Sequence, residues 1–335
     1  MRNSSKKSQY YWFLLTILIS LLSSCRFTSG DDSFVVDPGS SSFVYYGEAL
    51  PDEYLWNVIS YDTYAYAADG SNKFSVYDIL SPTNPMMIST FSLDSGTQPI
   101  KQMVSDNRYN IFIAAGNGGL FVVNTSNPSF PVSVFNDNSL FASGLDLYDD
   151  YLVVLNNNGW KLFYVTTSSQ LTELSSYSYF IDKKPLKVKF LDNWLFVLTD
   201  VSLDIFDVSN LSNIVLERSI LFTGTIDFAV FQNFVAVVTE RNLYFVDINM
   251  PLYAEIVRYY ELEWRPISIN FQNQYMFISW VNRNLSAYRI NSLNSISEIS
   301  RMQMTQPIHD ISFSQNYLYL ANGLNGLKVY YFLDF

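Results

Sequence analysis

The chain has 335 residues, a formal net charge of −11 at pH 7, and 15% charged against 49% hydrophobic residues. The large apolar fraction, with 17% aromatic residues, supplies a core and excludes a chain that is mostly disordered. Binding of nucleic acid needs a basic face, and the region after residue 40 has no dense lysine and arginine cluster. We therefore expect no nucleic-acid partner.

The first 25 residues have the pattern of an export signal. Three basic residues within the first seven positions precede an apolar run of 13 residues at positions 10–22, which is too short for a comfortable membrane span. Residues 22–25, Leu-Ser-Ser-Cys, resemble the lipobox of bacterial lipoproteins, and Cys25 is the only cysteine. We predict that residues 1–24 are a lipoprotein signal peptide and that Cys25 is acylated; an ordinary secretory peptide with an incidental cysteine is the alternative.

Residues 25–42 are predicted to be a lipidated, flexible tether, because the segment is rich in serine, glycine and aspartate. Several acyl chains would anchor the chain stably, since each buried methylene adds about 0.8 kcal/mol and one chain alone binds only marginally. We expect an exported protein held on a bacterial membrane through its N-terminal lipid. The outer membrane or the cell surface is expected rather than the inner membrane.

A hydrophobic phrase that ends in a polar or turn-forming residue occurs seven times between Phe74 and Phe332. The copies begin at positions 74, 120, 162, 203, 243, 285 and 327, so successive starts lie 46, 42, 41, 40, 42 and 42 residues apart. A period near 42 with strand-like composition is typical of a β-propeller whose blades each hold four strands. A helical solenoid is disfavoured, because no copy has apolar residues at spacings of three and four.

The fourth copy has the clearest pattern of a single blade. Residues 186–190 alternate between apolar and polar, residues 194–198 are apolar throughout, and residues 203–207 and 214–221 complete four predicted strands. Residues 192–193, Asp-Asn, predict a tight turn between the first two strands, because both side chains can bond their own backbone. Similar turns recur in the other copies and predict the same strand order there.

The number of blades follows from the ends of the repeat region. The seventh copy reaches only its third strand before the sequence ends at Phe335, whereas residues 42–48 precede the first copy and are prone to form a strand. Pairing this strand with the seventh copy would cover two bare sheet edges. We predict an all-β, seven-bladed β-propeller with four-stranded antiparallel blades, formed by residues 43–335 as one domain and closed by the N-terminal strand. Six blades plus an extra hairpin is the alternative.

The third strand and the turn after it form a recognisable motif. Residues 120–128, Leu-Phe-Val-Val-Asn-Thr-Ser-Asn-Pro, and residues 203–210, Leu-Asp-Ile-Phe-Asp-Val-Ser-Asn, resemble the LVIVD repeat family of bacterial surface propellers. Copies one, two, four and five match well, whereas Thr166, Arg289 and Tyr331 replace the aspartate in the others. The resemblance implies a propeller on an exported lipoprotein, but it implies no defined activity and transfers no functional residue.

Residues that could carry catalysis are scarce. His309 is the only histidine and Cys25 the only cysteine, which excludes a multi-histidine metal site and an internal Cys/His nucleophile. A Ser/His/Asp triad would need Asp310, the neighbour of His309, whose side chain should point to the opposite face of a strand. Residues 116–119 and 322–326 are glycine-rich, but no helix follows that could hold phosphate. We expect no enzymatic activity, no cofactor and no metal.

Two groups of polar residues are candidate binding sites. Near the start of the inner strands, six copies carry residues that would form a ring at the mouth of a central channel: Lys101, Asp146, Lys187, Asp227, Ser268 and His309. Strand alternation near solvent is the alternative explanation. The loops between second and third strands would form another surface: Asp69, Asn117, Asn157, Trp160, Asp200, Glu240, Arg241, Trp264, Trp280, Arg283 and Asn322. Protein interfaces and sugar sites both favour such residues.

These observations favour a noncatalytic binding or scaffold protein with an unknown protein or glycan partner at the cell surface or in the periplasm. One alternative is an exported propeller hydrolase, similar to a lactonase, with its site in the central channel. Lys101 and Lys187 weigh against it, because that chemistry would need several converging carboxylates. The other alternative is an accessory lipoprotein of outer-membrane assembly.

Overall fold

The computed structural model describes residues 28–29, 32–33, 42–50, 54–94, 96, 98–166, 169–180, 183–211 and 213–334. The predicted signal peptide, Cys25 and most of the predicted tether lie outside these residues. Strands β1 (Thr28–Ser29) and β2 (Asp32–Ser33) pair with each other as a short antiparallel hairpin. Within the described ranges, no helix has the length and apolar character needed to cross a membrane.

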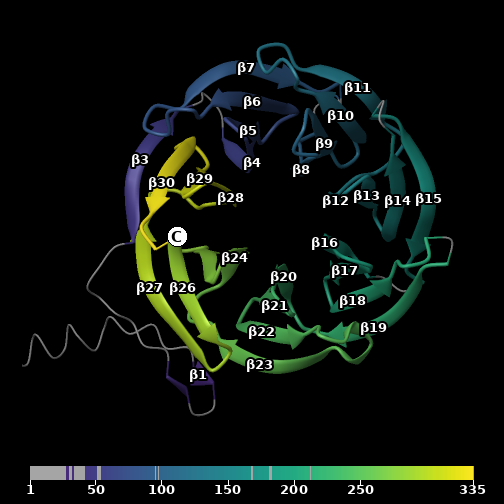
Figure 1. Ribbon diagram of the computed structural model, residues 1–335, viewed down its shortest axis with the longest axis vertical. Helices are drawn as coiled ribbons and strands as arrows, with labels where there is room; N and C mark the ends of the chain where they lie inside the picture. Colours follow the sequence, from purple (N-terminus) through teal and green to yellow (C-terminus); the bar gives the residue numbers. More distant parts are fainter. Residues whose placement is uncertain are drawn as a thin grey trace, which may run out of the picture.

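Seven four-stranded antiparallel sheets stand around a central axis as the blades of a propeller (Figure 1). Blade 1 contains β4 (Leu55–Tyr61), β5 (Tyr64–Asp69), β6 (Lys73–Asp78) and β7 (Met86–Ser92). Blade 2 contains β8 (Gln102–Ser105), β9 (Asn110–Ala114), β10 (Leu120–Asn124) and β11 (Val132–Asp137). Blade 3 contains β12 (Gly144–Tyr148), β13 (Tyr151–Leu155), β14 (Gly159–Val165) and β15 (Leu171–Ser178).

The remaining blades repeat this order from the axis outward. Blade 4 contains β16 (Pro185–Leu191), β17 (Trp194–Thr199), β18 (Ser202–Asp207) and β19 (Val215–Leu221). Blade 5 contains β20 (Thr225–Phe231), β21 (Phe234–Thr239), β22 (Asn242–Asp247), the 3-10 turn η1 (Pro251–Tyr253) and β23 (Glu255–Glu261). Blade 6 contains β24 (Pro266–Gln272), β25 (Tyr275–Trp280), β26 (Asn284–Ser292) and β27 (Ser295–Gln303), and blade 7 contains β28 (Asp310–Ser314), β29 (Tyr317–Ala321), β30 (Leu327–Phe332) and β3 (Phe43–Ala49).

The turns between the first and second strands of the seven blades share one backbone feature, although the connection in blade 2 is longer than the others. The first or second residue of each turn has a φ between 50° and 54°, in the left-handed region. Aspartate and asparagine tolerate this conformation better than other residues with a side chain, because they can bond the nearby backbone. The seven positions are Asp62, Asn107, Asp149, Asp192, Gln232, Asn273 and Gln315. The predicted turns therefore place a left-handed residue at the same point of each blade.

The hydrophobic core lies between neighbouring blades. Phe196 and Leu198 of blade 4 pack with Phe228 and Val235 of blade 5, and all four side chains are buried. Both faces of the second and third strands are covered in this way, which explains why they read as apolar runs rather than as alternating ones. Each blade thus depends on its neighbours for burial, so the ring must close.

Closure is provided by the N-terminal strand. Strand β3 pairs antiparallel with β30, with Phe43 opposite Phe332, so the first and last strands of the propeller lie in one sheet (Figure 1). The ring of Phe43 lies 5.3 Å from that of Phe332 and 6.3 Å from that of Phe277 in blade 6. The prediction of seven blades with a terminal blade closed by the N-terminal strand is confirmed, and the six-bladed alternative is wrong.

Candidate functional site

The first strands of all seven blades surround a central channel that contains a cavity of about 520 Å³. Each of these strands is the inner edge of its sheet, so part of its backbone N–H groups has no partner within the blade. A buried N–H group without a partner is costly. Polar side chains at the channel are therefore expected to bond the backbone.

Side chains from one blade cap the inner strand of the next. The carboxylate of Asp310 in blade 7 accepts a hydrogen bond from the backbone N–H of Val58 in blade 1 at 3.0 Å. The amide of Asn57 donates to the same carboxylate and accepts from the backbone N–H of Met103 in blade 2 at 3.0 Å. These contacts join three successive blades across the channel wall.

Three further caps follow the same rule. Each is a side-chain oxygen that accepts from a backbone N–H group of the next blade: Gln102 from Leu145 at 3.1 Å, Asp146 from Phe190 at 2.8 Å, and Asp227 from Ile269 at 2.9 Å. Caps thus cross five of the seven blade boundaries. Two of these caps, Asp146 and Asp227, belong to the ring that the sequence suggested as a ligand site, and their carboxylates bond the backbone of the next blade. Asn57, Gln102 and Asp310 were not part of that prediction.

The charged side chains of the channel are also paired. The Nζ of Lys187 lies 2.5 Å from Oδ1 of Asp227, and the Nζ of Lys189 lies 2.6 Å from Oδ1 of Asp146. Burial raises the pKa of Asp146 against the opposing effect of Lys189, and burial raises the pKa of Asp310 to about 6. Within the described part of the chain, no three histidine, cysteine or acidic side chains converge as a metal site would require.

Five of the six predicted ring residues line the channel, but Lys101 does not. The six also lie at three levels rather than one. The reference in each inner strand is one buried apolar residue: Met103, Leu145, Val188, Phe228, Ile269 or Ile311. Lys187, Asp227 and Ser268 lie one position before it, Asp146 one position after it, and Lys101 and His309 two positions before it. A β-bulge at the start of β4, β16, β20 and β24 adds a residue that the other inner strands lack. Counting from the repeat phrase could not detect these bulges.

The predicted loop surface is only partly a surface. Trp160 and Trp280 are fully buried between blades, which corrects their assignment to an exposed interface. Trp264 is half-buried and packs edge-on against Trp280, with ring centroids 6.0 Å apart. Asp69 and Asn322 are also buried and hold their own loops: Asp69 accepts from the N–H of Ser71 at 2.8 Å, and Asn322 donates to the carbonyl of Gln306 at 2.8 Å.

The other predicted loop residues are divided among three places. Arg283 has a φ of 71° and donates to the carbonyl of Thr305 at 3.4 Å, which holds the loop before blade 7. Glu240 and Arg241 line a cavity of about 410 Å³ in blade 5, and Glu240 lies 3.7 Å from Arg265. Asn117, Asn157 and Asp200 line a different cavity of about 820 Å³, together with Lys101.

We call this 820 Å³ hollow the rim cavity; it lies between blades 2, 3 and 4, where loops and inner-strand starts meet. Its charged lining consists of Lys101, Lys183, Lys184 and one carboxylate, Asp200. The sequence-based prediction missed Lys183 and Lys184. A signal was present, because they are the only adjacent lysines after the predicted signal peptide.

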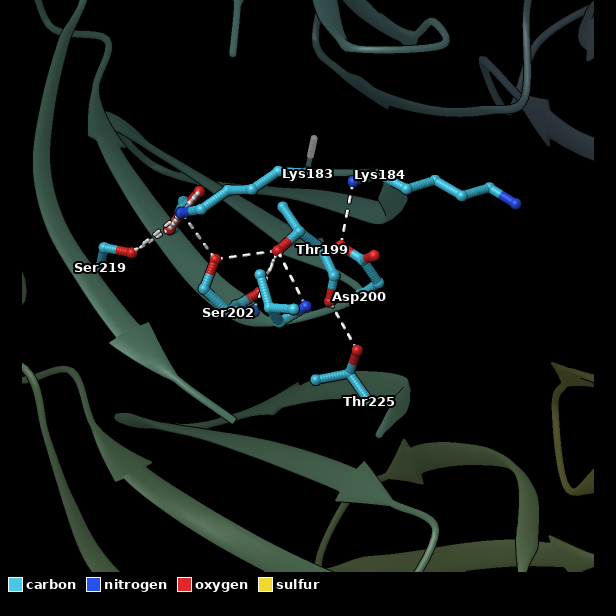
Figure 2. A network of polar contacts seen from close by, with 9 residues as sticks. Lys183, Lys184, Thr199, Asp200, Ser202, Ser219 and Thr225 are labelled. Atoms are coloured by element: carbon cyan, nitrogen blue, oxygen red, sulfur yellow. Dashed lines mark hydrogen bonds and ion pairs between the residues drawn. The ribbon is translucent and has the colours of Figure 1, made fainter. Parts of the chain in front are cut away.

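The two adjacent lysines differ in their environment (Figure 2). The Nζ of Lys183 points inward and lies 3.2 Å from Oδ2 of the fully buried Asp204 and 3.0 Å from Oγ of Ser202. Burial and the carboxylate of Asp204 raise the pKa of Tyr179, whose ring Lys183 faces at 5.4 Å. The backbone N–H of Lys184 donates to Asp200 at 3.0 Å, while its side chain extends away from the network.

A closely equivalent place between blades 7 and 1 is filled rather than hollow. In both places a glycine of the loop between the second and third strands forms a backbone bridge to the next blade: Gly116 with Ala142, and Gly323 with Leu55. The positions occupied by Lys101, Phe141 and Ser143 in the rim cavity correspond there to His309, Tyr54 and Trp56.

These three aromatic side chains cover one another. Trp56 stacks on His309 with ring centroids 4.7 Å apart and planes 19° apart, and the hydroxyl of Tyr54 makes a hydrogen bond with Nε2 of His309. Burial lowers the pKa of His309. Ser143, in the place of Trp56, is too small to cover Lys101. The same backbone bridge therefore supports a closed sector at blades 7 and 1 and an open sector at blades 2 to 4.

The ring of seven four-stranded blades and its capped channel place this protein among the seven-bladed β-propellers. The family model for the LVIVD repeat matches residues 54–92, 107–138, 186–221 and 308–329, so the chain is a β-propeller with LVIVD repeats. The match covers copies one, two and four as predicted and part of copy seven, whereas copy five, which we expected to match well, lies outside it.

No curated protein sequence matches the chain. Among solved structures, the fold is similar to that of the computationally designed Ika8 protein, with a TM-score of 0.63 and 10% sequence identity. The similar region covers 86% of this chain and 99% of the designed one. At this identity the similarity concerns the fold alone.

Proposed function

We propose that this chain is a noncatalytic binding protein. The propeller acts as a rigid scaffold, and the rim cavity, with the loops around it, is the surface that meets a partner. Cys25 carries a lipid that holds the protein on an exported face of a bacterial membrane, the outer membrane or the cell surface. Residues 25–42 give the propeller freedom to reach its partner.

The observation that carries this proposal is the contrast between the channel and the rim cavity. In the channel, the carboxylates of Asp146, Asp227 and Asp310 are occupied by backbone N–H groups or by lysines. A carboxylate that caps a neighbouring blade is poorly placed to act as a general base or nucleophile, because its oxygens already accept hydrogen bonds that hold the two blades together. At the rim cavity, by contrast, polar side chains face a hollow of a size typical of ligand sites.

The proposal is tested by cross-linking on intact cells that make the full chain. We expect a specific partner to be captured by the wild-type protein and capture to be reduced by substitutions around the rim cavity. The C25S variant should lose acyl labelling and leave the membrane fraction while keeping its fold. Turnover of lactones by the purified chain, abolished by D227N but not by changes at the rim cavity, would contradict the proposal and favour a channel hydrolase.

A further inference from the structure

The rim cavity concentrates positive charge in an acidic protein. Three lysines and one carboxylate line it, whereas the whole chain carries a net charge of −11. The charge of Lys183 is neutralised by Asp204, since its Nζ lies 3.2 Å from Oδ2 of that carboxylate. Within the described ranges, the ammonium groups of Lys101 and Lys184 make no ion pair. A concave surface of one sign attracts ligands of the other sign, so the occupant is expected to be an anion.

The position of Lys101 is preorganised by the backbone beneath it. Gly116 has a φ of 57° and bridges to Ala142 through two backbone hydrogen bonds of 2.6 and 3.0 Å. The aliphatic part of Lys101 lies against Gly116, since a Cβ built there would be 3.6 Å from its Cε. In the closed sector His309 holds the equivalent place under Trp56. Ser143 removes that cover and leaves the ammonium group of Lys101 exposed to the cavity.

The groups offered to a ligand are side chains rather than backbone. The N–H of Lys184 is bonded to Asp200, the N–H of Asp200 to the carbonyl of Lys184, and the N–H of Gly116 to Ala142. A peptide that adds as a strand needs free backbone groups along an edge, and these three N–H groups are already bonded. The amides of Asn117, Asn157 and Asn158 remain, and such groups suit hydroxyl ligands.

Two aromatic side chains complete the lining. Phe180 is fully exposed at the edge of the cavity, and Phe141 is half-buried in its wall. Phe180 therefore offers an uncovered aromatic face at the cavity, and aromatic faces pack well against the C–H face of a sugar ring. The cavity thus combines ammonium groups for carboxylates, amides for hydroxyls and aromatic rings for sugar faces.

We propose that the rim cavity binds an acidic oligosaccharide, with Lys101 and Lys184 contacting carboxylates on its sugars. This inference rests on the proposed binding function and specifies its ligand. Phe180 packs on a sugar ring, and the asparagine amides bond the hydroxyls. Lys183 serves as a positioning residue that supports the cavity floor through Asp204.

The test measures binding of three probes to the full chain in detergent by calorimetry: tetragalacturonate, neutral galactotetraose and tetraglutamate. We expect tetragalacturonate to bind, and its affinity to fall with added salt because charge contributes. The double variant K101M/K184M should weaken this binding at least tenfold. S143W, which places the covering residue of the closed sector over Lys101, should weaken it at least tenfold as well. K161M is the matched control, because Lys161 pairs with Glu173 at 2.7 Å outside the cavity and its loss should leave affinity unchanged.

Several results would overturn the inference. If galactotetraose binds as tightly as tetragalacturonate, charge does not contribute to binding. If tetraglutamate binds more tightly than tetragalacturonate, the cavity is a site for an acidic peptide. Absence of tetragalacturonate binding, or equal effects of K101M/K184M and K161M, would also refute it. If cross-linking on cells still captures a partner that does not depend on these lysines, only this inference fails. If no partner is captured at all, the proposed function fails first.

Discussion

The open sector at blades 2 to 4 and the closed sector at blades 7 and 1 share a backbone bridge and differ in the three side chains that lie above it. Both use a glycine bridge to the next blade, Gly116 with Ala142 and Gly323 with Leu55. In the closed sector Trp56, Tyr54 and His309 fill the space above the bridge; in the open sector Ser143, Phe141 and Lys101 leave a cavity. The same backbone bridge can therefore carry either a covered or an open blade boundary, depending on the side chains above it.

The largest expected effect concerns the floor of the open sector. D204A leaves the Lys183 ammonium, whose side chain is 17% exposed, without its buried partner. Removing one member of a buried ion pair is costly, so the free energy of unfolding should fall by about 3 kcal/mol in urea denaturation. E173A removes an exposed partner of Lys161 and should cost less than about 1 kcal/mol. Equal costs would show that the pair does not support the cavity floor.

The second prediction concerns a substitution that removes the aromatic cover of the closed sector. W56S gives blade 1 the small residue that Ser143 supplies in blade 3. Trp56 is 44% exposed, so the loss should be about half that of a buried aromatic side chain, about 2 kcal/mol in the free energy of unfolding. Urea denaturation measures it. A cost near zero would mean that the stack on His309 contributes nothing to closure of the sector.

A smaller effect compares the two bridging glycines. Gly116 and Gly323 both have a φ of 57°, so alanine at either site should cost about 1 kcal/mol for the left-handed backbone. At Gly323 the new Cβ would also lie 3.0 Å from the ring of Tyr54, whereas at Gly116 it would lie 3.6 Å from the flexible stem of Lys101. We expect G323A to be less stable than G116A by about another 1 kcal/mol. The reverse order in thermal or urea unfolding would contradict the packing difference between the sectors.

The smallest effect is a pH dependence of the closed sector. Burial lowers the pKa of His309, so the unfolded chain takes up the histidine proton at a higher pH than the folded chain. The free energy of unfolding should therefore fall as the pH drops below about 6.5, and this loss is complete below the folded pKa. H309Q should flatten that part of the profile between pH 7 and 5.

The neighbouring carboxylate of Asp310 has the opposite effect on how the free energy of unfolding changes with pH. Burial raises the pKa of Asp310 to about 6, so the folded chain takes up this proton first and gains stability as the pH falls from about 6 toward 4. Because Asp310 is present in both proteins, the difference between the wild-type and H309Q profiles isolates the histidine. K101Q, the matched change in the open sector, should leave the slope unchanged, because it leaves the buried His309 in place. Identical slopes for all three proteins would argue against a buried neutral His309.

The fold could be predicted because its determinants are local and repeated. Apolar runs, alternating inner strands and turns such as Asp192-Asn193 act within a few residues, and the same pattern occurs in each blade. The candidate sites could not be predicted as well. Asp146 and Asp227 were correctly placed at the channel, but their role as caps depends on the backbone of the next blade, about 42 residues away. Trp160 and Trp280 resembled interface residues, yet neighbouring blades bury them completely.

Sequence by itself determined the strands, the turns and the number of blades, because hydrogen bonding within a hairpin and hydrophobic alternation need only nearby residues. Only the tertiary structure decided how the blades meet. Bulges at four inner strands shift the level of the channel residues, and Lys101, Ser143 and Lys184 reach one cavity from three different blades. Contacts between blades depend on packing across the whole ring, and no local pattern in the chain encodes which side chains will meet there.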